Sequence, residues 1–156
     1  EEMIGPYPFA GEKVGVVETP HLGMEHQTIN AYGNDFKKTD AGYDWLLQHE
    51  FAHEWFGNQL THSDWDDFWL HEGFACYCEW LWSEESGGRS ADERARDHWV
   101  KLAGKPQDLL LGDPGPHDMF DDRVYKRGAL LLHAIRLTVG DDAFFGLLRV
   151  WVDTNR

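Results

Sequence analysis

Two histidines with a glutamate between them lie four residues apart in the stretch WLLQHEFAHEWFGNQ, residues 45–59. In an α-helix, residues i and i+4 lie on one face, so the imidazoles of His49 and His53 can point at a single place while Glu50 stands beside them. Imidazole nitrogen is a ligand that Zn²⁺ prefers, and this spacing suits a tetrahedral site. The pattern predicts a metal centre on a helix, with one Zn²⁺ per chain.

A hydrolytic zinc site needs a third protein ligand and an open position for water. Residues 54–71 separate His53 from Glu72, which falls on the next predicted helix and is the natural candidate. Glu50 would then be the base that takes a proton from the attacking water. Spacing alone also leaves open a polar stripe on a surface helix, although buried His and Glu need partners or a metal. It leaves several rivals for the third ligand: Glu54, Asp64, Asp66, Asp67 and Glu79.

Helices dominate the elements that must position these residues. Apolar residues at helical spacing predict helices over 42–56, 68–83, 91–103, 121–140 and 141–155. Ser90 and Glu93 form a capping box for the third helix, an Asp cap is expected for the last, and Gly57 supplies a left-handed stop for the first. A strand is expected over 13–19, a loop or edge strand over 23–28, and irregular chain over 31–40 and 104–120. The predicted fold class is α+β, mostly helical, with a small N-terminal β element.

Composition narrows the range of partners. The 156 residues fit one domain with its own core, and 28 acidic against 14 basic residues give a formal charge of −14. This charge repels phosphate backbones and anionic lipid heads, so neither nucleic acid nor membranes are expected as partners. Cys76 and Cys78 would lie about 200° apart on a helix, which argues against a disulfide between them. Two buried thiols fit a reducing compartment and favour the cytoplasm.

Four segments carry a resemblance to a known family. In chain order they are LGMEH (22–26), the run His49-Glu50-Phe51-Ala52-His53 continued as HEWFGNQLT, LHEGFA (70–75), and VYKRGA (124–129). The middle two resemble the zinc signature of the M1 (gluzincin) aminopeptidases. LGMEH resembles that family's exopeptidase motif G-x-M-E-N, and VYKRGA resembles the segment with its catalytic tyrosine. The resemblance extends over residues 5–150.

The resemblance implies a thermolysin-like zinc peptidase catalytic domain over residues 1–156. It implies His49, His53 and Glu72 as zinc ligands and Glu50 as the general base. The implied reaction is hydrolysis of the first peptide bond of peptides with a free N-terminus. The family's N-terminal β domain and C-terminal helical domain are not in these residues, so the chain is expected to be part of a larger multidomain protein.

Further roles follow from the same resemblance. Glu25 matches the glutamate that binds the substrate's α-amine, where a carboxylate suits an ammonium that an internal peptide bond lacks. Tyr125 matches the tyrosine whose hydroxyl stabilises the oxyanion. Gly23 and Met24 match backbone positions that line the substrate path. Without the resemblance, Glu25 would be interpreted as a solvated loop acid and Tyr125 as a residue of an amphipathic helix.

Departures from the family pattern leave parts of the function open. Leu22, His26 and His71 stand where the family has Gly, Asn, and Asn or Lys, so the preference of the first substrate pocket is not carried over. One alternative is a zinc metalloendopeptidase, which would cleave N-blocked substrates. Another is a zinc-stabilised, catalytically silent scaffold or interaction domain. A structural site would fill the fourth zinc position with protein and would need neither Glu50 nor Tyr125.

Overall fold

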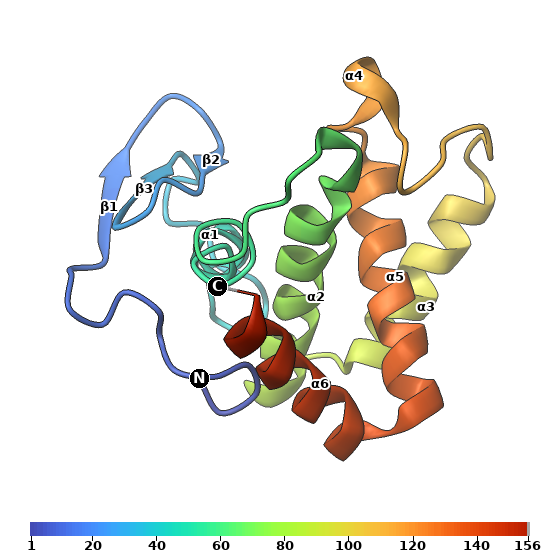
Figure 1. The fold of residues 1–156 in the computed structure, drawn as a ribbon. Helices are drawn as coiled ribbons and strands as arrows, with labels where there is room; N and C mark the ends of the chain where they lie inside the picture. The colour runs from blue at the N-terminus through green and yellow to red at the C-terminus, as the bar shows by residue number, and fades with distance from the viewer. Residues whose placement is uncertain (156) are drawn as a thin grey trace.

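The computed structural model describes residues 1–155, which run from a small sheet into a helical body (Figure 1). The strands are β1 (Gly15–Glu18), β2 (Gly23–Met24) and β3 (Ile29–Tyr32). The helices are α1 (Trp45–Ala52), α2 (Trp69–Glu85), α3 (Ala91–Ala103), α4 (Gly115–Asp118), α5 (Asp122–Val139) and α6 (Asp141–Thr154), with a 3-10 turn at Trp65–Asp67. The predicted α+β, mostly helical class is confirmed. None of the described helices is long and apolar enough to cross a membrane.

The sheet has the strand order β1-β3-β2, with β1 parallel and β2 antiparallel to β3. β2 lies at an edge and pairs Gly23 with Tyr32. The prediction of an irregular stretch over 31–40 is wrong at its start, because Ala31 and Tyr32 are buried residues of β3. A strand of four residues is too short to show a clear alternation, and β3 is defined by its two neighbours and by its contact with α1.

Asp44 determines where α1 begins. Its carboxylate accepts hydrogen bonds from the backbone N–H groups of Leu46 and Leu47, at 3.0 and 3.2 Å, and from the Asn34 amide at 3.0 Å. The Tyr32 hydroxyl donates to the other carboxylate oxygen. Because the capping carboxylate satisfies N–H groups that the first turn leaves free, the helix begins at residue 45 rather than at the predicted 42.

The end of α1 also differs from the prediction. The helix ends at Ala52 instead of residue 56, because the N–H groups of Glu54 and Trp55 donate to carbonyls three residues back and the chain tightens. His53 is the C-cap and keeps helical angles, φ −64° and ψ −15°, so it still lies one turn after His49. Gly57 has the positive φ expected of it, 146°, but the prediction that it stops the helix is wrong, because α1 has already ended at Ala52.

α2 is the centre of the helical body. It contacts α1 on one side and α5 on the other, and α3 and α6 pack against α5 (Figure 1). Phe74, Tyr77 and Trp80 of α2 are buried, and Phe74 stacks on Phe56 with ring centroids 4.4 Å apart. Burial of each such side chain contributes roughly 2–3 kcal/mol. Glu72 therefore stands in the first turn of a helix that the core holds rigidly.

The later helices test the predicted caps. The capping box of α3 is confirmed: the Ser90 hydroxyl accepts from the Glu93 N–H at 3.2 Å, and the Glu93 carboxylate accepts from the Ser90 N–H at 2.9 Å. The Asp cap of α6 is wrong, because Gly140 is the N-cap and no side chain caps the helix. The Asp141 carboxylate instead accepts from the Arg136 guanidinium at 2.8 and 2.9 Å.

α2 and α5 cross with their backbones in close contact at two glycines. A Cβ on Gly128 would lie 2.7 Å from the Cα of Gly73, and a Cβ on Gly73 would lie 2.8 Å from the Cα of Gly128. Backbone atoms at such a distance leave no room for a side chain. Gly73 directly follows Glu72, and Gly128 lies three residues after Tyr125, so the glycine crossing brings Tyr125 close to the Glu72 carboxylate.

Gly128→Ala is expected to lower the free energy of unfolding by up to about 2 kcal/mol. Overpacking costs roughly 1–3 kcal/mol, and the higher helix propensity of alanine offsets about 1 kcal/mol of that cost. Gly146 of α6 is a matched control, since no atom lies within 4 Å of where its Cβ would be. Gly146→Ala should stabilise the protein by about 1 kcal/mol. Denaturant unfolding measures both, and an equal gain for the two variants would show that the crossing can accept a methyl group.

Candidate metal centre

Three possible ligand atoms from α1, its C-cap and α2 meet at one place. Nε2 of His49 lies 3.1 Å from Nε2 of His53 and 3.1 Å from Oε2 of Glu72. Nε2 of His53 lies 3.5 Å from the same oxygen. A tetrahedral Zn²⁺ with bonds of about 2.0–2.1 Å holds its ligand atoms roughly 3.3–3.4 Å apart. The three predicted ligands are thus brought together, all buried, at distances that fit the ion.

The outer nitrogens of both imidazoles face acceptors. Nδ1 of His49 lies 2.8 Å from a Glu79 carboxylate oxygen, and Nδ1 of His53 lies 2.9 Å from the Phe56 carbonyl oxygen. Each Nδ1 therefore donates its N–H, which leaves Nε2 of a neutral ring with a bare lone pair. Two bare nitrogens and a carboxylate oxygen that face one another in a buried place need positive charge between them. A metal ion suits this set of donors.

The electrostatics of the cluster also favour a cation. Burial disfavours the ionised form of Glu72, but in the metal-free site His49 and His53, when protonated, donate hydrogen bonds to this carboxylate, which outweigh burial and hold the pKa of Glu72 far below its usual range. Burial works to lower the pKa of His49, but hydrogen bonds to Cys76 and to two carboxylates reverse this and raise it well above its ordinary value. The site therefore stabilises positive charge, carried by a proton or by a metal ion.

Glu50 lies beside the cluster with an unpartnered carboxylate oxygen. It is 4% exposed, and its Oε2 has no hydrogen-bond partner among the described residues. Burial raises the pKa of Glu50 to about 7, against the opposing effect of His49 and His53. A carboxyl group with a pKa near neutrality can both take up and return a proton.

β2 places the predicted substrate-binding residues next to this carboxylate. Gly23 and Met24 form the strand, and Glu25 follows it. The backbone of Gly23 approaches Glu50 so closely that a Cβ would lie 2.0 Å from its Oε1. The Glu25 carboxylate, Glu50 and His53 offer atoms that all lie within 4.8 Å of one another. The edge strand and the metal cluster thus share one surface.

Tyr125 reaches the cluster from α5. Its ring lies parallel to that of His49, with centroids 6.4 Å apart and an angle of 18° between the planes. Burial, and after it the Glu72 carboxylate, raises the pKa of Tyr125 far above its ordinary value. The hydroxyl therefore stays protonated and is able to donate a hydrogen bond into the site.

Glu79, for which spacing predicted at most the role of a rival third ligand, occupies a different position. It contacts Nδ1 of His49, on the opposite side of the ring from the cluster. Glu79 lies seven residues after Glu72, so both carboxylates share one face of α2, and this spacing is a signal that could have identified it. Carboxylates in this position orient a metal-binding histidine. The other rivals form no ligand group with the histidines in the part of the chain that the structure describes: Glu54, Asp64, Asp66 and Asp67.

His71 stands next to Glu72 but does not join the cluster. Its Nε2 accepts a hydrogen bond from the backbone N–H of His62 at 3.1 Å, so the ring links α2 to the segment that precedes it. Burial, followed by the neighbouring His62, lowers the pKa of His71 to about 4. The other departures from the family pattern, Leu22 and His26, are exposed.

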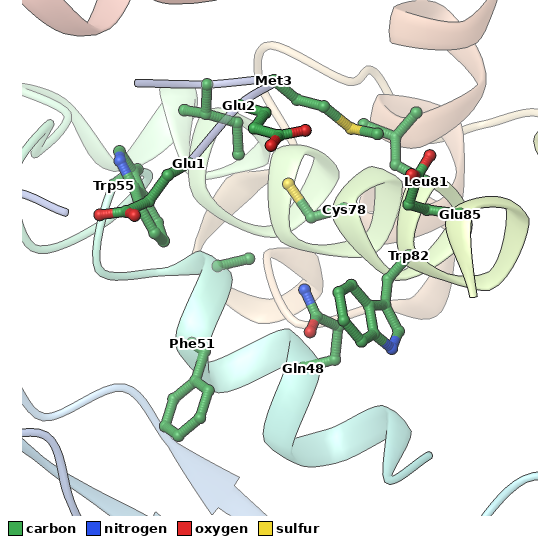
Figure 2. Close-up of a pocket in the computed structure, with 12 residues that line it drawn as sticks. Glu1, Glu2, Met3, Gln48, Phe51, Trp55, Cys78, Leu81, Trp82 and Glu85 are labelled. Atoms are coloured by element: carbon green, nitrogen blue, oxygen red, sulfur yellow. The ribbon is translucent and has the colours of Figure 1, made fainter. Parts of the chain in front are cut away.

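A cavity of about 450 Å³ lies on another face of α1 and α2 (Figure 2). Much of its wall is formed by Phe51 of α1, Trp55 of the turn that follows it, and Leu81 and Trp82 of α2, with Met3 from the N-terminal segment. Among the described residues that line it there is no histidine and none of the predicted catalytic residues. The cavity is therefore separate from the metal centre.

Two histidines one turn apart, a carboxylate from the next helix and a buried glutamate beside them are the residue types that a metal centre of the hydrolytic class requires. Residues 24–156 match the Peptidase family M1 domain. The chain is 31% identical over 128 residues to Probable aminopeptidase 2 of Sulfurisphaera tokodaii, covering 71% of this chain and 16% of that protein. It is 28% identical over 170 aligned positions to Aminopeptidase B of Mus musculus, covering 98% of this chain and 26% of that protein. The chain belongs to peptidase family M1.

Solved structures share the fold. An M1 zinc metallopeptidase from Deinococcus radiodurans is 38% identical, with a TM-score of 0.85, over 99% of this chain and 34% of that one. Leukotriene A4 hydrolase from Saccharomyces cerevisiae has a TM-score of 0.79 at 22% identity, over 99% of this chain and 27% of that one. The chain thus spans between 16% and 34% of the length of these relatives. The family membership expected from the four segments is confirmed.

Proposed function

We propose that this chain is the catalytic domain of a zinc aminopeptidase, with Zn²⁺ held by His49, His53 and Glu72. The observation that carries the proposal is the convergence of three ligand atoms beside Glu50, whose carboxylate has an oxygen with no partner among the described residues. Two histidines and one carboxylate leave the fourth position of a tetrahedral ion open, as in hydrolytic sites. Membership of family M1 supports the proposal, because relatives are named aminopeptidases and zinc metallopeptidases.

The residues around the centre suit distinct steps of peptide hydrolysis. When bound, Zn²⁺ would polarise the scissile carbonyl and make the attacking water more acidic. Glu50 would take the proton from that water and pass it to the leaving amine, and a pKa near 7 suits both transfers. Tyr125 would donate a hydrogen bond to the oxyanion that develops on the carbonyl.

We propose peptides with a free N-terminus as the substrates. The Glu25 carboxylate, close to Glu50, would pair with the α-ammonium of the first residue, which an internal residue lacks. Gly23 and Met24 lie on an edge strand, whose outer backbone groups can bind an extended peptide. A mutant of the Deinococcus radiodurans metallopeptidase has been solved with Tyr-Ser-Ala as substrate. A peptide of that kind suits the arrangement described here.

Metal analysis combined with an activity assay tests the proposed function. The purified protein should hold one zinc per chain and release a fluorophore from an amide of an unblocked amino acid. A chelator should abolish release, and added Zn²⁺ should restore it. Zinc without turnover would favour the scaffold alternative, and equal cleavage of N-blocked peptides would favour an endopeptidase. A folded protein that binds no zinc would overturn the proposal.

Glu25→Ala is expected to lower kcat/KM for a substrate with a free amine by roughly 10- to 100-fold, which is the range for losing a hydrogen bond to a charged group. Inhibition constants of N-acetylated peptides should stay nearly constant, because these peptides have no ammonium to bind. Glu18→Ala, which removes an exposed carboxylate from β1, is the matched control and should change neither value. Equal losses for free and acetylated peptides would remove the assigned role of Glu25.

A further inference from the structure

A polar chain of four side chains, three of them buried and the fourth, Lys126, half-buried, lies behind the candidate metal centre. It begins at Lys126 of α5, whose Nζ donates to Sγ of Cys76 at 3.1 Å. Cys76 is 1% exposed and lies on α2, one turn after Glu72. Sγ of Cys76, a carboxylate oxygen of Glu79 and a ring nitrogen of His49 all lie within 4.8 Å of one another. The chain therefore joins an ammonium on α5 to an imidazole on α1.

The hydrogen-bond donors on both sides of this chain point toward the Glu79 carboxylate. The sulfur accepts from the Lys126 ammonium, and the thiol, within 4.8 Å of a Glu79 carboxylate oxygen, has its hydrogen to offer to that carboxylate. Glu79 also accepts from Nδ1 of His49 at 2.8 Å. Every member thus has a partner of the right type, which is the condition under which a buried polar network orders its members.

This arrangement supports a neighbouring site and does not hold a cation of its own. Although Cys76, Glu79 and His49 have the ligand types of a metal site, the Lys126 ammonium lies against the sulfur. A second cation there would be repelled by Lys126. The Nδ1 of His49 also keeps its proton for Glu79, so it has no lone pair to offer.

We propose that Lys126 is a positioning residue of the metal centre: acting through the Cys76 thiol, its ammonium holds the Glu79 carboxylate against Nδ1 of His49 and so increases the affinity of the centre for its metal. The inference rests on the proposed function, because it takes His49 as a ligand of Zn²⁺.

The charges around His49 show why a cation is needed at this place. Glu72 faces Nε2 of the ring and Glu79 faces Nδ1. Both carboxylates are buried, at 5% and 8% exposure. Two buried carboxylates repel each other, and an ion pair with a cation compensates their desolvation. Lys126 supplies positive charge from the side of Glu79, which leaves the opposite side of His49 free for the metal.

The test measures zinc affinity by chelator competition in the full chain of the Lys126→Met variant. Affinity should fall about tenfold, at the lower end of the 10- to 100-fold range for residues that support a metal ligand. The zinc affinity of Glu79→Gln should fall further within that range. Lys101→Met, which removes an exposed ammonium from α3, is the control of equal charge change and should keep wild-type affinity.

A double-mutant cycle shows whether Lys126 acts through Glu79. In the Glu79→Gln background, Lys126→Met should cause little further loss of zinc. A loss of the same size in both backgrounds, or wild-type affinity in Lys126→Met, would overturn the inference. Cys76→Ala keeps the lysine but breaks the chain and should lose about as much affinity as Lys126→Met, whereas Cys76→Ser should retain most of it. If the wild-type protein binds no zinc, the proposed function itself fails, which is a different result from equal affinities in wild type and variants.

Discussion

Glu50→Gln is expected to retain zinc and to lower kcat by roughly 10²–10⁴-fold, the contribution of a positioned general base. Glutamine has nearly the same shape but cannot accept a proton, and Glu50 is not one of the three converging ligands. The substitution should not lower the free energy of unfolding. Because burial raises the pKa of Glu50 to about 7, the stability that its protonated form contributes is lost as the pH rises through that value. At pH 8 the neutral amide should therefore unfold with equal or higher free energy.

The matched control for this variant is Glu54→Gln. Glu54 is a second buried glutamate, four residues further along, at 1% exposure, and it belongs to no ligand group with the histidines among the described residues. The same substitution there should leave kcat within a few-fold of wild type. Measured together, zinc content, kcat and unfolding free energy separate a lost base from a damaged site. Full turnover by Glu50→Gln would remove Glu50 from the mechanism.

The parts of the site closest in sequence were the easiest to predict. His49 and His53 lie one turn apart, so helix geometry alone brings their rings to one place. Glu72 is different, because α2 approaches α1 only through packing of the core, and spacing left Glu79 as a rival. In the structure the two carboxylates contact different nitrogens of His49: Glu72 faces Nε2 and Glu79 faces Nδ1. That distinction depends on the crossing of two helices, which no local pattern contains.

Tertiary contacts likewise explain the elements that were missed. β3 is stabilised by strands on both sides and by α1, not by a pattern of its own four residues. The prediction of an Asp cap for α6 was wrong because the Asp141 carboxylate binds the guanidinium of Arg136, at the end of α5, and does not cap the helix. Lys126 and Cys76 lie fifty residues apart in the chain and meet only because Gly73 and Gly128 let α2 and α5 touch. Local signals predicted most helices, whereas contacts between helices complete the site.

His53→Ala is expected to abolish tight zinc binding, with a loss greater than the roughly 100-fold that removal of a supporting residue causes. His53 is fully buried at 1% exposure, and its Nε2 faces both other ligand atoms, so no neighbouring group can replace it. The protein should also lose its stabilisation by zinc. A metal that binds only the folded state stabilises it by about 4 kcal/mol at a thousandfold excess over Kd. Added Zn²⁺ should therefore raise the Tm of the wild type and leave that of the variant unchanged.

Removal of any buried histidine can destabilise the fold. The control for this prediction is therefore a variant that loses a buried imidazole elsewhere. His53→Ala frees the Phe56 carbonyl that accepted from Nδ1, at a cost of about 1–3 kcal/mol. His133→Ala removes another buried imidazole, 6% exposed and within 3.2 Å of the Tyr77 hydroxyl but outside the ligand groups of the described chain. It should lower Tm to a similar degree yet keep the upward shift with Zn²⁺. If His53→Ala keeps that shift as well, the metal is held by atoms other than the three that converge here, and the proposed centre is wrong.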